Sequence, residues 1–113
     1  MKIVRTTRNP GGLTSASTDS NGMTPLMRAV DFGQAEAVRR LIRVGADVNA
    51  TDKWGQTALM LAAGRNDVLC ATLLIEARAD LNVRARNGLT ALGYAVDNHQ
   101  LDTAKLLKRA GAR

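Results

Sequence analysis

The 113-residue sequence has very few aromatic residues, because Phe32, Trp54 and Tyr94 are the only three. A core built from large rings is therefore excluded, and small side chains must fill the interior. Alanine is the most frequent residue, with 18 copies. It is the best helix former, and its small side chain lets helices approach one another closely. The scarcity of rings and the abundance of alanine together predict closely packed short helices.

Cysteines and long apolar runs are scarce as well. Cys70 is the single cysteine, which excludes an intramolecular disulfide framework. No apolar run approaches the ~20 residues that a membrane-spanning helix needs, and residues 1–18 contain no apolar stretch typical of a secretory signal. We therefore expect a cytoplasmic protein with the length of one domain and no contact with a membrane.

Acidic residues are absent before Asp19. Lys2, Arg5 and Arg8 therefore give residues 1–18 a charge of +3, out of +6 for the whole chain. The other 95 residues contain 13 basic and 10 acidic residues, a mildly basic balance that disfavours nucleic-acid binding. Residues 1–18 also contain a Pro-Gly-Gly turn signal and a Ser/Thr-rich stretch. We expect them to form a leader or an N-terminal cap.

A pattern of 33 residues recurs three times after residue 18. Gly22, Gly55 and Gly88 lie 33 residues apart and begin the similar stretches GMTPLMRA, GQTALMLA and GLTALGYA. A second motif follows later in each period: GADVN from residue 45, RADLN from residue 78 and a truncated GAR at residue 111. In such an array each repeat packs only on its neighbours. The periods divide the chain into repeats 19–51, 52–84 and 85–113.

Each period carries the local signals of two short helices. A threonine stands where a helix N-cap oxygen is favoured: Thr24, Thr57 and Thr90. Pro25 follows at the first helical position, where its missing N–H costs nothing. A second helix is predicted over 35–44, ending before Gly45, which can adopt a left-handed conformation. Each period therefore reads as helix, turn, helix and extended loop, and neighbouring pairs must stack to bury their apolar faces.

These motifs resemble the ankyrin repeat, whose 33-residue period, Gly-x-Thr-Pro-Leu start and Gly-Ala-Asp-Val-Asn end they share. The resemblance covers residues 19–113, which are 95 of the 113. It implies an all-α solenoid of stacked helix-turn-helix pairs, with β-hairpin-like fingers projecting between repeats. It also implies that the fingers and the first helices form a concave surface, which in the family usually binds other proteins.

The sequence departs from the family pattern at two kinds of position. Met27, Met60 and Gly93 stand where the family usually has a histidine that supports hydrogen bonds in the loops, so we expect that polar network to be absent. Arg78 stands where the other repeats have the glycine that ends the second helix. A left-handed backbone at a residue other than glycine costs about 1–2 kcal/mol. We therefore expect Arg78→Gly to stabilise the fold.

The last repeat has basic residues on its second helix: Lys105, Lys108 and Arg109. A terminal repeat must make its exposed stacking face soluble, and cations also suit the C-terminal end of a helix. We expect these three residues to perform that role.

No catalytic, cofactor-binding or metal-binding constellation is present. His99 is the only histidine, and its place between the two helices of the third repeat is typical of a solvated turn residue rather than of a general base. Cys70 lies among leucines, which favours a buried apolar role. Asp47 and Asp80 recur with the period, so we expect them to cap loops. One cysteine and one histidine cannot form a Cys/His metal site, and no phosphate-binding Gly-rich loop occurs.

The resemblance places candidate partner-binding residues on the fingers and on the turns between helices. These are Phe32, Lys53, Trp54, Gln56, Arg65, Arg86, Leu89 and Asn98. Trp54 and Phe32 are expected to be exposed, and an exposed ring with arginine nearby is typical of an interface hot spot. The alternative for Trp54 is partial packing against the adjacent finger without a partner.

Four basic residues are expected to cluster on the second and third fingers: Lys53, Arg65, Arg84 and Arg86. Three acidic residues are expected to dilute that charge: Asp31, Asp52 and Asp97. The cluster favours an acidic protein partner that is steered by charge. An ordinary solvated charged rim is the alternative interpretation.

We interpret the sequence as a non-enzymatic protein–protein interaction module, with no cofactor and no small-molecule substrate. One alternative is polyanion or nucleic-acid binding through the basic residues, which the lack of a series of stacking aromatics disfavours. Another is a regulatory or structural piece of a larger assembly, such as a bacterial effector or a toxin-neutralising protein. The residues do not identify the partner or the oligomeric state.

Overall fold

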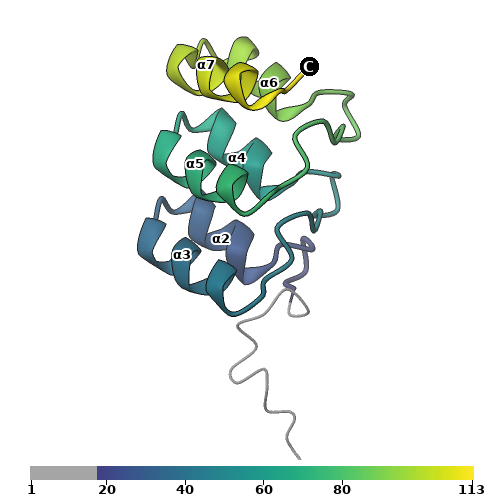
Figure 1. The fold of residues 1–113 in the computed structure, drawn as a ribbon. Coiled ribbons are helices and arrows are strands. Elements are labelled where there is room, and N and C mark those ends of the chain that lie inside the picture. The colour runs from purple at the N-terminus through teal and green to yellow at the C-terminus, as the bar shows by residue number, and fades with distance from the viewer. Residues whose placement is uncertain (1–17) are drawn as a thin grey trace, which may run out of the picture.

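The computed structural model describes residues 18–113, and that part of the chain contains six α-helices and no β-strand. The helices form three consecutive pairs: α2 (Pro25–Asp31) with α3 (Ala35–Arg43), α4 (Ala58–Gly64) with α5 (Val68–Glu76), and α6 (Ala91–Asp97) with α7 (Leu101–Ala110). The pairs are stacked, so that α2, α4 and α6 form an inner row and α3, α5 and α7 form an outer row (Figure 1). The predicted all-α solenoid is confirmed. The prediction of a leader or cap concerns residues 1–18, of which 1–17 lie outside the described residues.

The inner helices begin at the predicted threonine caps. The side-chain oxygens of Thr24, Thr57 and Thr90 accept hydrogen bonds from the backbone N–H three residues later, at 3.1, 3.3 and 3.1 Å. Each such cap stabilises its helix by about 1 kcal/mol. Pro25 occupies the first position of α2, as its fixed backbone angle favours.

Left-handed residues follow the outer helices. Gly45 and Gly111 have φ angles of +94° and +106°, and Arg78 occupies the equivalent place with φ +67°. α3 ends at Arg43, one residue before the predicted end. The left-handed conformation considered for Arg78 is therefore confirmed. The turns between the two helices of each repeat contain a left-handed residue as well, with φ +69° at Gly33, +55° at Asn66 and +57° at His99, which lie one period apart.

Alanine and leucine form most of the core. The fully buried side chains include leucines of both helix rows, with alanines between them: Leu59, Leu74, Leu107, Ala62, Ala63, Ala71 and Ala95. Met27 and Met60 are buried among them, as packing residues should be. Cys70 is a buried free thiol, and desolvation raises its pKa to about 12, so it remains protonated and inert at neutral pH.

Asparagine side chains connect the loops of adjacent repeats. Asp47 and Asp80 accept hydrogen bonds from the backbone two residues later, which confirms their predicted loop-capping role. Asn49 Oδ1 then accepts a hydrogen bond from Asp80 N–H at 2.7 Å, and Asn82 Oδ1 accepts one from Arg113 N–H at 2.9 Å. The same contact therefore joins the first repeat to the second and the second to the third.

No helix in residues 18–113 is long and apolar enough to cross a membrane.

Candidate protein-binding surface

The loops that precede the inner helices form three similar fingers: residues 19–23, 52–56 and 85–89. In each finger the backbone N–H of the first residue donates to the carbonyl four residues later, at 3.1, 3.0 and 2.9 Å. These tight turns form the predicted hairpin-like fingers, without any residue in a β-strand. They project to one side of the helix stack (Figure 1).

Backbone hydrogen bonds fix the spacing between fingers. Lys53 N–H donates to Asn21 O, and Arg86 N–H donates to Trp54 O, both at 3.0 Å. The backbones approach so closely that a Cβ atom on Gly55 would lie 3.2 Å from Arg86 N. Gly55 also has φ +76°, so glycine is required here both for the space between the backbones and for the left-handed conformation. The backbone itself therefore fixes the row of fingers.

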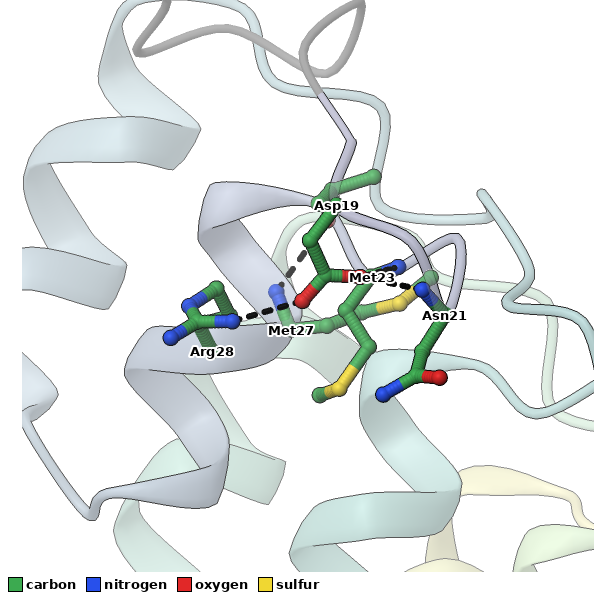
Figure 2. A network of polar contacts seen from close by, with 6 residues as sticks. Asp19, Asn21, Met23, Met27 and Arg28 are labelled. Carbon is green, nitrogen blue, oxygen red and sulfur yellow. Dashed lines mark hydrogen bonds and ion pairs between the residues drawn. The ribbon is translucent and has the colours of Figure 1, made fainter.

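An aspartate holds the first finger in shape. Asp19 Oδ1 accepts hydrogen bonds from Asn21 N–H and Met23 N–H, and its Oδ2 accepts one from the Arg28 side chain at 2.6 Å (Figure 2). The hydrogen bond from Met23 is the main cause that lowers the pKa of Asp19 below 3.8, with Asn21 and Arg28 acting in the same direction. Arg28 on α2 thus ties the finger to the helix that follows it.

A second aspartate holds the finger that carries the tryptophan. Asp52 Oδ1 accepts hydrogen bonds from Trp54 N–H and Gln56 N–H, both at 2.9 Å. Asp52 is only 6% exposed, so the prediction that it dilutes charge on the surface is wrong. Its buried Oδ2 has no hydrogen-bond partner among the described residues, because Leu61 stands where the first repeat has Arg28. Asp52 orients Trp54 from beneath the surface.

Trp54 borders a hollow between the second and third fingers. Its side chain is 47% exposed, and Lys53 Nζ lies 4.8 Å from its ring centroid, a cation–π distance. The hollow has a volume of about 340 Å³ and is lined by Trp54, Gln56, Arg86, Asn87 and Tyr94. Tyr94 OH accepts hydrogen bonds from Gln56 Nε2 at 3.1 Å and from Asn87 Nδ2 at 3.0 Å. Two fingers and helix α6 therefore meet at one hydroxyl.

Three of the eight predicted partner-binding residues lie at the other end of the inner helices, away from the fingers. Phe32, Arg65 and Asn98 are the C-cap residues of α2, α4 and α6. Each inner helix has seven residues, so this end lies about 10 Å from the fingers. Arg65 pairs with Asp31 across the repeats at 3.9 Å. The predicted clustering of Arg65 on the fingers is therefore wrong, because a period position after the inner helix faces the turns instead.

A family model described as ankyrin repeats, in three copies, matches residues 8–52 and 26–113. The chain belongs to the ankyrin-repeat family. Ankyrin repeats are generally non-enzymatic modules that mediate protein–protein interactions. No curated protein sequence matches the chain.

The ankyrin repeats present most of the predicted binding residues to solvent. Five of the eight are on the fingers: Lys53, Trp54, Gln56, Arg86 and Leu89. Gln56 and Leu89 are half-buried, whereas Phe32 at the turn end is 64% exposed. For Trp54 the expectation of exposure is confirmed, and Lys53 covers part of its ring.

Tyr94 on the inner helix α6 was not among the binding residues predicted from the sequence. Its ring is half-buried, but its hydroxyl lines the hollow at the fingers. The available signal was its period position, where the other repeats have Arg28 and Leu61. A residue type that varies between a cation, an apolar chain and a phenol marks a position that is not part of the repeat core.

Proposed function

We propose that this ankyrin-repeat chain binds a protein partner on the row of fingers, with Trp54 as the apolar anchor. The observation that carries the proposal is the 47% exposure of Trp54 on a finger whose backbone is bonded to both neighbouring fingers. A large ring on a rigid loop loses little conformational entropy on binding, so more of its contact energy contributes to affinity.

The charge around Trp54 supports an acidic partner. Lys53, Arg84 and Arg86 are exposed on or beside the second and third fingers, and none has an acidic ion-pair partner within residues 18–113. Cations of this kind accelerate the encounter with an acidic protein. Nucleic-acid binding is less well supported, because Trp54 is the only ring on the described fingers and single strands need a series of stacking platforms.

Affinity capture with the wild-type chain and with Trp54→Ala in parallel tests the proposal. We expect a partner retained by the wild type to lose about 2 kcal/mol or more of binding free energy with Trp54→Ala, as an interface anchor does. The thermal unfolding midpoint should stay nearly unchanged, because the ring is half exposed. Leu101→Ala is the matched control, since Leu101 is an exposed apolar residue at the start of α7 in the outer row. Equal binding of the partner to wild type and Trp54→Ala would contradict the proposal.

A further inference from the structure

The Tyr94 hydroxyl has an unused proton. A phenol offers two acceptor sites and one donor. Both acceptor sites are taken by the amide groups of Gln56 and Asn87. The orientation of Asn87 is fixed, because its Oδ1 accepts a hydrogen bond from Leu89 N–H at 3.0 Å and its amide nitrogen must therefore face Tyr94. The O–H of Tyr94 is thus left to donate to an acceptor that is not among its partners in residues 18–113.

The hollow beside Tyr94 has more donors than acceptors. Arg86 lines it with a guanidinium that has no acidic partner among the described residues, and the amides of Gln56 and Asn87 each have a second N–H. The Oδ1 acceptor of Asn87 is already occupied. Trp54 provides an apolar wall on the same hollow. A volume of about 340 Å³ is roughly ten times the space of a water molecule in the liquid, enough for a side chain.

We infer that this hollow binds the carboxylate of an aspartate or glutamate in the partner, next to an apolar residue that packs on Trp54. The inference rests on the proposed function of the fingers and names the chemistry that they recognise. Arg86 can donate two parallel hydrogen bonds to a carboxylate, and Tyr94 O–H supplies a third donor. An apolar side chain in the hollow would cover these donors without satisfying them, and a neutral amide would leave the charge of Arg86 unpaired, so both would be discriminated against. The single guanidinium matches the single charge of a carboxylate.

Selection of random twelve-residue peptides displayed on yeast tests this inference with defined probes. We expect enrichment of peptides in which an acidic residue adjoins an apolar one. Binding of a synthetic enriched peptide that carries a fluorescent label can be followed by its fluorescence anisotropy, a readout that serves the wild type and every variant, including Trp54→Ala. Arg86→Gln should weaken binding about tenfold or more, as expected for a hydrogen bond to a charged group. Tyr94→Phe should weaken it severalfold.

Arg84→Gln is the matched control, because it removes the same charge beside the third finger but from a residue that does not line the hollow. It should weaken binding much less than Arg86→Gln. Replacing the acidic residue of the peptide by its amide should weaken binding to the wild type and cause little further loss with Arg86→Gln. If circular dichroism shows that Tyr94→Phe is unfolded, the two arginine variants still decide the question.

Four outcomes would overturn the inference. Enriched peptides without acidic residues, or equal losses with Arg84→Gln and Arg86→Gln, would exclude the carboxylate site while leaving a protein-binding function on the fingers intact. Peptides that bind the wild type and Trp54→Ala equally would contradict the proposed function itself, and so would a selection without enrichment.

Discussion

The outer helix of the middle repeat differs from the outer helices of the terminal repeats. α3 and α7 each carry one acidic and three basic residues, whereas Glu76 is the only charged residue of α5. α5 packs against both α3 and α7, while each of these has one outer-row neighbour among the described residues. Lys108 of α7 is exposed at the end of the stack, as expected, and Arg40 of α3 lines an open groove, whereas Arg39 lines a hollow shared with α5. Position in the stack therefore determines these residues more than the repeat pattern does.

The largest effect on the free energy of unfolding is expected from shortening a buried leucine of the middle outer helix, α5. Leu74 of α5 is fully buried, and Leu41 occupies the equivalent place on α3 next to an open groove of about 650 Å³. Leu74→Ala should lower the free energy of unfolding by about 3 kcal/mol, since a cavity closed on both sides cannot collapse. Leu41→Ala should cost less. Urea denaturation measures both, and equal losses would remove the distinction between covered and open faces.

The next effect concerns the ends of the outer helices. Arg78 ends α5 in the left-handed region that glycines adopt after α3 and α7. Arg78→Gly should raise the free energy of unfolding by about 1 kcal/mol, because it removes the steric strain of a Cβ atom. Gly45→Ala is the reciprocal change and should destabilise by a similar amount. An unchanged or lower urea midpoint for Arg78→Gly would show that the arginine is not strained.

A comparable effect is expected at the beginning of the outer helices. Asp67 caps α5 by accepting a hydrogen bond from Cys70 N–H at 3.0 Å, whereas Gln34 before α3 makes no side-chain cap. Asp67→Ala should cost about 1 kcal/mol, and Gln34→Asp should give α3 a similar benefit. Thermal unfolding of both variants tests this. If Gln34→Asp leaves the thermal unfolding midpoint unchanged, then the first turn of α3 frays independently of its cap.

The smallest effect on stability is expected at the first finger, where Asp19 pairs with Arg28, whereas Asp52 of the second finger has no such partner among the described residues. The pKa of Asp19 is lowered, so its contribution to stability is present above pH 3.8 and is lost as the pH falls through the lower folded-state pKa. Asp19→Asn should therefore flatten the fall of the thermal midpoint as the pH drops below about 4. Arg28→Ala should flatten it less, because the hydrogen bonds from Asn21 and Met23 remain. Parallel pH profiles for Asp19→Asn and the wild type would contradict this.

Local features of the fold could be predicted from the sequence because their causes lie within a few residues. The threonine caps, Pro25 and the left-handed Gly45 follow from short-range spacing, and the repeat period then places the stack. Contacts between repeats could not be predicted in the same way. The Arg65–Asp31 ion pair and the Tyr94–Gln56 hydrogen bond join residues 34 and 38 apart, slightly more than one period. These two contacts form only when adjacent repeats are stacked with a particular offset, which the residues of one repeat do not reveal.

The candidate site was predictable in part for the same reason. The finger position of Trp54 comes directly from the repeat register, and so does its exposure. The orphaned Oδ2 of Asp52 depends on Leu61 replacing a cation that only the first repeat supplies. The hollow at Tyr94 is formed jointly by the second finger, the third finger and α6, so it could not be predicted from the residues of any single repeat.

The asparagine contacts between loops have a consequence for how such a chain can grow. Asn49 and Asn82 make the same bond to the backbone of the repeat that follows, and Lys53 and Arg86 make the same bond to the finger that precedes. Each junction therefore contains everything needed to join one further unit. Duplication of residues 52–84 in tandem would lengthen the array by one finger without redesign of any existing contact. A duplication of that kind would lengthen the row of fingers in a single step, and the two copies of Trp54 would then be free to diverge.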